Sequence, residues 1–270
     1  MKPDAYQREA ITRALGLCEA SLREPLAVAS MAEAACYSLF HFCRVFAATT
    51  GHTPYQYLLR RRLCEAAREV EAGSHNLSRI AFDYQFGSPE TFSRAFRRLF
   101  GVLPSQWRRQ GAHHPSLFMP AFSEELLEHL HQRVTFDAPA PPVPATLHGL
   151  MAPGYGEETA RGLQSAMPWL AHSEARWQAR VQASGNAVYT FVGTPAPHEG
   201  MPLACLALPA EGWFTAAHSD EARWVGLTLV CLRHIRLAHM LPVQAERLSL
   251  ACLRRHAQGT TTHVYTRMQP

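Results

Sequence analysis

The chain has 270 residues, which is enough for two domains that each bury a core of their own. It has neither an apolar run long enough to cross a bilayer nor a signal-peptide segment at its start, so we expect a cytoplasmic protein without a membrane partner. Seven scattered cysteines without a CxxC pair argue against a disulfide framework. Residues 1–111 hold 15 Lys and Arg against 10 Asp and Glu, a balance of +5 that is compatible with nucleic-acid binding and with an ordinary solvated face.

One segment of the chain occurs twice. Residues 37–57, YSLFHFCRVFAATTGHTPYQY, return as residues 86–107, FGSPETFSRAFRRLFGVLPSQW. From Ser38 onward, each residue of the first copy matches the residue 50 positions later, and before Ser38 the residue 49 positions later. The one-residue difference falls at Gly87. Because an insertion in a turn disturbs neither flanking helix, each copy is predicted to be a short helix, a tight turn and a second helix.

The second helix of each copy has clear start and stop signals and two unlike sides. Ser38 and Ser88 are typical N-caps, and Gly51 and Gly101 are typical of helix ends. At about 100° per residue, one side is apolar in both copies and is predicted to be core: Phe42, Val45, Phe46 and Thr49, then Phe92, Ala95, Phe96 and Leu99. The copies differ on the opposite side, as two reading heads for different base sequences would.

A single long helix is predicted between the two copies, over residues 53–73. It opens with Pro54 and ends at Gly73. A helix of ~19 residues is ~28 Å long, close to the ~34 Å between successive major grooves on one face of B-DNA. One chain could therefore place both heads on DNA without dimerising.

Residues 5–110 resemble the DNA-binding domain of the AraC/XylS family of bacterial transcription regulators, through FGSPETFSRAFRRLFGVLPSQWR and its first copy. The resemblance implies an all-α double helix-turn-helix domain over residues 1–111 that binds double-stranded DNA through two adjacent major grooves. It also implies an activator with RNA polymerase as a further partner. The base-reading positions carried over by the resemblance are Phe40, Cys43 and Arg44 in the first copy and Pro89, Glu90, Thr91 and Arg94 in the second. Phosphate contacts are expected from Arg60, Arg61, Arg62, Arg97 and Arg98.

Some of these positions depart from the polar residues of well-known family members. Phe40 and Cys43 offer apolar contact, for example to a thymine methyl group. Glu90 either accepts a hydrogen bond from cytosine or pairs with Arg94, four residues further along the helix.

Residues 112–142 have the composition of a linker with one short helix, followed by the proline run APAPPVP. Residues 143–270 are predicted to form an α+β domain of two βαββ repeats, an antiparallel sheet with two helices packed on it. The predicted elements are a strand (145–152), a helix (157–171), two strands (186–193 and 201–208), a strand (212–218), a helix (220–240) and two strands (246–255 and 262–268).

This second domain resembles the GyrI-like effector-binding domain of regulators of the right-origin-binding-protein type, through its element order and the segment LPAEGWFTAAHSDEARW. It departs from that family at Ser219 and Asp220, where a glycine is usual. The resemblance implies a small-molecule effector. The aromatic residues Trp169, Tyr189, Trp213 and Trp224 are the expected partners of a flat, apolar molecule, and Glu246 is the expected counter-charge if that molecule is cationic.

Two alternatives stay open for the second domain. It could bind a protein partner, or have no ligand, and some GyrI-like relatives hydrolyse small molecules. The sequence has no motif for a nucleophile beside a base, so we expect no enzyme. No cofactor is expected, and the histidines are too scattered to predict a metal site.

Overall fold

The computed structural model describes most of the chain. The described residues are 5–111, 118–132, 134–136, 140–154, 157–182, 188–198, 203–209, 213–218, 248–256 and 259–267. They divide into two compact units, a helical one up to residue 132 and one built on a sheet from residue 134 onward. Among these residues, none of the helices is both long and apolar enough to span a membrane.

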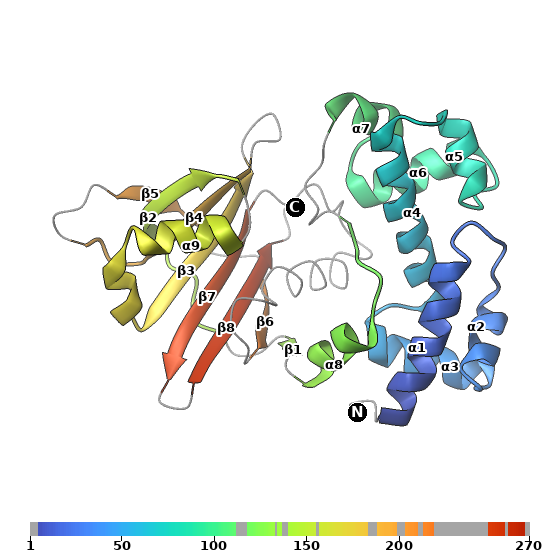
Figure 1. The fold of residues 1–270 in the computed structure, drawn as a ribbon, viewed down its shortest axis with the longest axis horizontal. Helices are drawn as coiled ribbons and strands as arrows, with labels where there is room; N and C mark the ends of the chain where they lie inside the picture. The colour runs from blue at the N-terminus through green and yellow to red at the C-terminus, as the bar shows by residue number, and fades with distance from the viewer. Residues whose placement is uncertain are drawn as a thin grey trace. The chain divides into compact units, whose positions relative to one another are not determined.

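The helical unit contains two helix-turn-helix halves joined by a long helix (Figure 1). α4 runs between them, contacting α2 and α3 of the first half and α5 and α6 of the second. The helices are α1 (Ala5–Ala20), α2 (Val28–Ala34), α3 (Leu39–Thr50), α4 (Pro54–Ala72), α5 (Leu77–Asp83), α6 (Pro89–Phe100), α7 (Pro104–Gln110) and α8 (Glu124–Gln132). The expected repeat is thus present, and the connecting helix has 19 residues.

Helix ends follow the predicted signals with one difference. Gly51 and Gly101 end α3 and α6 in the left-handed conformation, with φ of 71° and 79°. At the start of α6, the Ser88 hydroxyl accepts a hydrogen bond from the backbone N–H of Thr91 at 3.2 Å. Ser38 occupies the same place before α3 but makes no side-chain cap bond. The position of both caps was therefore predictable, and only one of the two bonds forms.

The core of the helical unit consists of aromatic rings at equivalent positions of the two halves. Phe42, Phe46 and Tyr57 are fully buried in the first half. The matching residues, Phe92, Phe96 and Trp107, are fully buried in the second. Consecutive rings in each row are 5.3 to 5.8 Å apart, within the range of favourable aromatic contacts. The prediction that the four phenylalanines pack in the core is confirmed.

α8 contacts α1 and α3. The middle of the expected linker, residues 112–142, is therefore packed into the helical unit, whereas β1 (Val134–Phe136) after it pairs with β6 (Trp213–His218) in the sheet.

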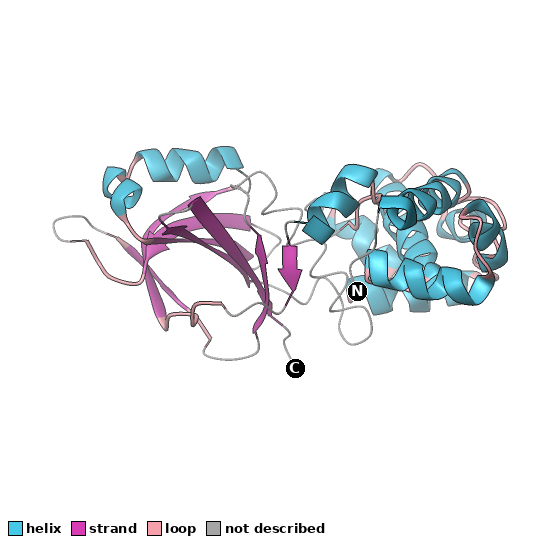
Figure 2. Ribbon diagram, turned by 90° about the horizontal axis from the view of Figure 1, so that it is seen from below, coloured by secondary structure: helices cyan, strands magenta, loops and turns pink. Residues whose placement is uncertain are grey.

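The second unit is an antiparallel sheet of eight strands, in the order β1-β6-β8-β7-β3-β4-β2-β5. A helix, α9 (Glu157–Ser165), contacts β2 and β4 and lies with the short helix η2 (Pro168–His172) on one face of the sheet (Figure 2). The strands are β1 (Val134–Phe136), β2 (Thr146–Pro153), β3 (Ala175–Gln182), β4 (Val188–Thr194), β5 (Ala204–Ala207), β6 (Trp213–His218), β7 (Leu248–His256) and β8 (Gly259–Arg267).

The strand assignment within the first expected repeat was incomplete: β2, β4 and β5 lie where strands were predicted, but one strand was missed. β3 follows η2 and was not predicted, and β5 pairs with β2 as an additional edge strand. The order of the six inner strands is symmetric about its centre, where β7 lies beside β3. Outward from the centre, the strands are β7, β8 and β6 on one side and β3, β4 and β2 on the other. The helix expected at 220–240 lies outside the described residues.

Candidate nucleic-acid interface

The first candidate reading head is the outer side of α3. Phe40 stands in its first turn with 82% of its surface exposed, and Arg44 is exposed one turn later. Cys43 lies half-buried between them. Together with the neighbouring Leu39, which is 51% exposed, Phe40 provides apolar surface that can meet a thymine methyl group in a major groove.

Arg44 has a neighbour that sequence analysis missed. Its Nη2 lies 3.3 Å from Nδ1 of His41, one turn earlier on α3. The His41 ring in turn packs edge-on against Tyr37, with centroids 4.6 Å apart. His41 thus restricts where the guanidinium group points, and the three-residue spacing was the available signal.

The second candidate reading head is the outer side of α6. Glu90, Thr91 and Arg94 are exposed, and Pro89 is half-buried at the first helical position. A hydrogen bond with Ser88, together with the charge of Arg94, lowers the pKa of Glu90. A carboxylate in the first turn is also favoured by the helix dipole, so this head presents a fixed negative group beside its arginine.

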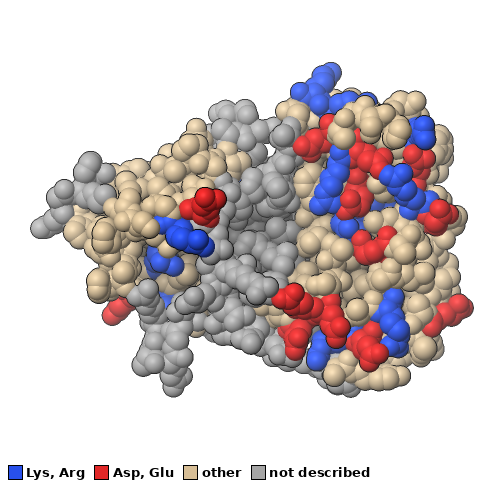
Figure 3. Space-filling view, viewed as in Figure 1, with Lys and Arg blue, Asp and Glu red and all other residues tan. Residues whose placement is uncertain are grey.

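Arg97 and Arg98 are exposed in the last turn of α6. Both remain available for phosphate contact, although cations at a helix C-terminus also stabilise the helix itself. On the face of the helical unit that Figure 3 shows, basic and acidic side chains are interspersed. This face therefore carries no purely basic patch.

Burial contradicts the predicted phosphate contacts of Arg60 and Arg61, while that of Arg62, which is half-buried, stays a prediction. Arg60 and Arg61 are only 6% and 5% exposed. Arg62 donates to two backbone carbonyls, those of Leu22 at 2.9 Å and Glu24 at 2.6 Å. Arg60 and Arg61 are thus enclosed by the helical unit, and the bonds of Arg62 tie α4 to the segment after α1.

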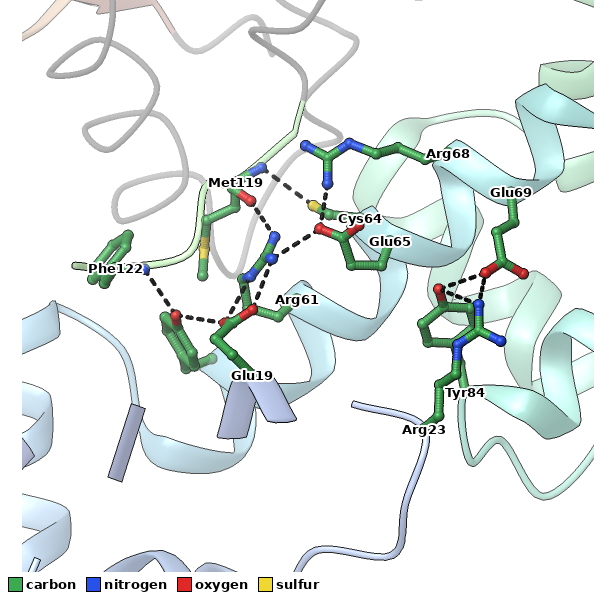
Figure 4. A network of polar contacts seen from close by, with 11 residues as sticks. Glu19, Arg23, Arg61, Cys64, Glu65, Arg68, Glu69, Tyr84, Met119 and Phe122 are labelled. Atoms are coloured by element: carbon green, nitrogen blue, oxygen red, sulfur yellow. Dashed lines mark hydrogen bonds and ion pairs between the residues drawn. The ribbon is translucent and has the colours of Figure 1, made fainter. Parts of the chain in front are cut away.

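Arg61 is the centre of a buried polar network (Figure 4). It pairs with Glu19 of α1 at 2.8 Å and with Glu65 of α4 at 2.8 Å, and it donates to the carbonyl of Met119 at 2.6 Å. Burial opposes its charge, yet the hydrogen bonds and charge of Glu19 hold the pKa of Arg61 above its ordinary value. Burial instead lowers the pKa of Arg60 to about 10.

The comparison with known proteins agrees with this geometry. The model of a helix-turn-helix domain family matches residues 31–110. The transcriptional activator AarP of Providencia stuartii is 33% identical over 107 residues, which cover 40% of this chain and 79% of that protein. The multiple antibiotic resistance protein MarA of Salmonella typhimurium is 32% identical over 101 residues, or 37% of this chain and 80% of that protein.

The chain belongs to the AraC family of helix-turn-helix transcription regulators.

This membership comes from the helical unit alone. The right origin-binding protein of Escherichia coli is 36% identical over 91 residues, but these cover 34% of this chain and only 32% of that protein. Among solved structures, an AraC-type regulator from Chromobacterium violaceum is similar with a TM-score of 0.37 and 29% identity, covering 40% of this chain and 96% of that one. The DNA-binding domain of AdpA, solved with a target DNA, has a TM-score of 0.34 and 29% identity, covering 39% and 92%.

In this AraC-family chain, the aromatic residues expected to hold an effector do not all come together. Trp169 packs with Met167, Leu170 and Val192 in the cluster beneath α9. Trp213 packs against the other cluster, which contains Trp177, Phe191 and Tyr265. Since consecutive strand residues such as Phe191 and Val192 point to opposite faces, Trp169 and Trp213 lie on opposite faces of the sheet.

Tyr189 and Trp213 lie on strands that are not neighbours. Tyr189 lies on β4 and Trp213 on β6, with β3, β7 and β8 between them. At ~4.8 Å per strand spacing, that separation is ~19 Å along the sheet, which is an upper limit on the direct distance because sheets twist. The prediction of one shared aromatic site was therefore wrong for Trp169 with Trp213. A site shared by Tyr189 and Trp213 stays a prediction, and Trp224 and Glu246 lie outside the described residues.

Proposed function

We propose that this chain is a sequence-specific transcription activator that reads two adjacent major grooves with α3 and α6, acting in the bacterial cytoplasm with RNA polymerase as its partner. The observation that carries the proposal is the contrast between matching cores and unlike exposed faces in two helix-turn-helix halves. Packing alone gives no reason for an exposed arginine at the same place in both halves. The naming of AarP as a transcriptional activator supports the sign of regulation.

The length of α4 supports binding as a monomer. Its 19 residues correspond to ~28 Å at 1.5 Å per residue, close to the ~34 Å between successive major grooves on one face of the duplex. α3 and α6 belong to the same chain and differ in sequence. The expected site is therefore asymmetric, with two unlike half-motifs about 10 base pairs apart.

The contacts divide into base reading and positioning. On α3, Phe40 and Cys43 provide apolar contact and Arg44 a hydrogen-bond donor. On α6 the corresponding groups are Pro89, Glu90, Thr91 and Arg94, with the carboxylate of Glu90 suited to accept from cytosine. Arg97 and Arg98 contact phosphate and contribute affinity without sequence preference.

Selection of bound duplexes from a random library tests the proposal, because the library contains every candidate site. We expect enrichment of one asymmetric sequence with two half-motifs about one helical turn apart, bound with one chain per duplex in a sedimentation experiment. Enrichment of a palindrome bound only by two chains would overturn binding as a monomer. No enrichment at all would overturn the proposed function.

For the second unit we propose a GyrI-like effector-binding domain. The symmetric order of its six inner strands supports this, as does α9 lying on one face of the sheet. Thermal unfolding of the full chain with a panel of planar cationic and neutral dyes tests it, since a ligand of the native state raises the melting temperature. If no dye shifts the transition, the effector proposal fails and a protein partner becomes the better explanation of the domain.

A further inference from the structure

Residues 118–132, which we call the strap, lie against α4 and α1 and complete the helical unit. Their backbone is held by side chains of α4 (Figure 4). The carbonyl of Met119 accepts from Arg61 at 2.6 Å and its N–H donates to Sγ of Cys64 at 3.2 Å, while the N–H of Phe122 donates to the hydroxyl of Tyr57 at 3.1 Å. Buried backbone groups with such defined partners indicate a docked segment rather than a loose connection.

The two phenylalanines of the strap enter different halves of the unit. The Phe118 ring lies beside Phe100 and Trp107 of the second half, with centroids 6.4 and 6.0 Å away. The Phe122 ring lies beside Tyr57 and His52, next to the first half, at 5.4 and 6.0 Å. Both phenylalanines are at least nine-tenths buried. A short stretch of chain thus packs a ring against the aromatic core of each half.

The strap also contacts the elements that carry the first head. α8 touches both α1 and α3. Arg61 links the same region to α1, because Glu19 receives hydrogen bonds from Tyr57 at 2.9 Å and from Arg61 at 2.8 Å. α4 and the strap therefore form a double connection between the halves that carry α3 and α6.

We propose that Phe118 and Phe122 are positioning residues that set the spacing of the two reading heads to match successive major grooves. This inference rests on the proposed function, because it requires that α3 and α6 bind one duplex. Without the two rings, α4 is still continuous, but each half loses a buried partner that ties it to the other. The two heads can then take a wider range of distances from one another. Each head still binds its own half-motif as before.

The test compares full-length variants on duplexes built from the selected site. The wild type should bind the selected spacing at least about tenfold more tightly than duplexes with one base pair added or removed between the half-motifs, since one base pair rotates one groove by about a tenth of a turn. In the Phe118→Ala/Phe122→Ala variant this preference should fall to about twofold or less, by the same geometry. Affinity for duplexes that keep only one half-motif should stay unchanged.

Two further variants separate positioning from general damage. Phe118→Leu/Phe122→Leu keeps apolar side chains in both cores and should restore the spacing preference. Phe82→Ala removes an exposed phenylalanine of α5 that is outside the strap and should leave the preference at its wild-type value. If the double alanine variant is unfolded by circular dichroism, the single variants Phe118→Ala and Phe122→Ala are measured in its place, each with a reduced preference expected.

The outcomes distinguish the two proposals. A wild type that enriches no duplex contradicts the proposed function itself. A wild type that binds the selected site, with folded alanine variants that keep its spacing preference, overturns the positioning role and leaves the proposed function intact. If the alanine variants bind full sites and single half-motifs equally more weakly than the wild type, the positioning role is also overturned. That pattern is expected of a general loss of folded protein.

Discussion

In the first helix-turn-helix half, Phe42, Phe46 and Tyr57 occupy the places that Phe92, Phe96 and Trp107 occupy in the second, fifty residues later. The outer sides show the opposite relation. Where α3 exposes Phe40 and half-buries His41, α6 exposes Glu90 and Thr91. Only the arginine is common to both, as Arg44 and Arg94.

The partners of that arginine differ between the halves. Arg44 contacts the imidazole of His41, while Arg94 acts by its charge on the carboxylate of Glu90. An identical side chain is therefore held in two electrostatic settings. The comparison teaches that the duplication preserved the packing that builds each head and left the reading surface free to diverge.

Among the variants that test the difference between the two halves, those of the two arginines should have the largest effect on DNA binding. Arg44→Ala and Arg94→Ala should each weaken binding to the selected site by about 1 to 3 kcal/mol, and each should relax base preference in a different half-motif. Competition binding with duplexes randomised in one half-motif at a time measures both effects.

A control arginine is available on α1. Arg13 is exposed, pairs with Glu9 within its own helix and donates to the carbonyl of Ala34 at the end of α2 at 3.3 Å. Because it lies on neither α3 nor α6, Arg13→Ala should leave base preference unchanged. If both Arg44→Ala and Arg94→Ala relaxed the same half-motif, the assignment of one head to each groove would be wrong.

A smaller effect should separate the two helix starts. Ser88→Ala removes the cap bond to the N–H of Thr91 and should lower the free energy of unfolding by about 1 kcal/mol. Ser38 makes no side-chain cap bond, so Ser38→Ala should change it by much less. Urea denaturation of the full chain, followed by far-ultraviolet circular dichroism, measures the difference. Equal losses would mean that Ser38 caps α3 in solution as Ser88 caps α6.

The helical unit was largely predictable because its signals are local. Glycine at helix ends, proline at first positions and a 50-residue repeat define the elements, and the helical period separates buried from exposed sides. The same period also contained a warning about Arg61. It lies four residues after Tyr57 and three before Cys64, on the stripe that α4 buries, and we interpreted its charge rather than its position.

Other features depend on contacts that no local signal contains. Residues 111–122, GAHHPSLFMPAF, have the glycine and prolines of a linker, and nothing nearby indicates that Phe118 and Phe122 enter two separate cores. β3 did carry a signal, the alternation of ARWQARVQ, with Trp177 and Ala179 buried and polar residues between them. We predicted no element over this segment, in which one of the two arginines, Arg180, is only 3% exposed.

The smallest predicted effect concerns the turns inside the two halves. Cys36 and Gln85 stand at equivalent positions, 49 residues apart, and both have a positive φ, of 57° and 64°. Side chains with a Cβ are strained in this left-handed region and glycine is not. Cys36→Gly should therefore raise the free energy of unfolding by roughly 0.5 to 1 kcal/mol, although glycine also gains entropy in the unfolded chain.

Gln85→Gly should raise the free energy of unfolding by less than Cys36→Gly does. This variant also loses the hydrogen bond that Nε2 of Gln85 donates to the carbonyl of Arg23 at 2.5 Å. Cys36→Ser is the control for the loss of the thiol, since serine keeps the Cβ and should give no gain. Urea denaturation of the three variants beside the wild type compares them directly. A gain in Cys36→Ser equal to that in Cys36→Gly would assign the effect to the thiol and remove backbone strain as the feature that the two turns share.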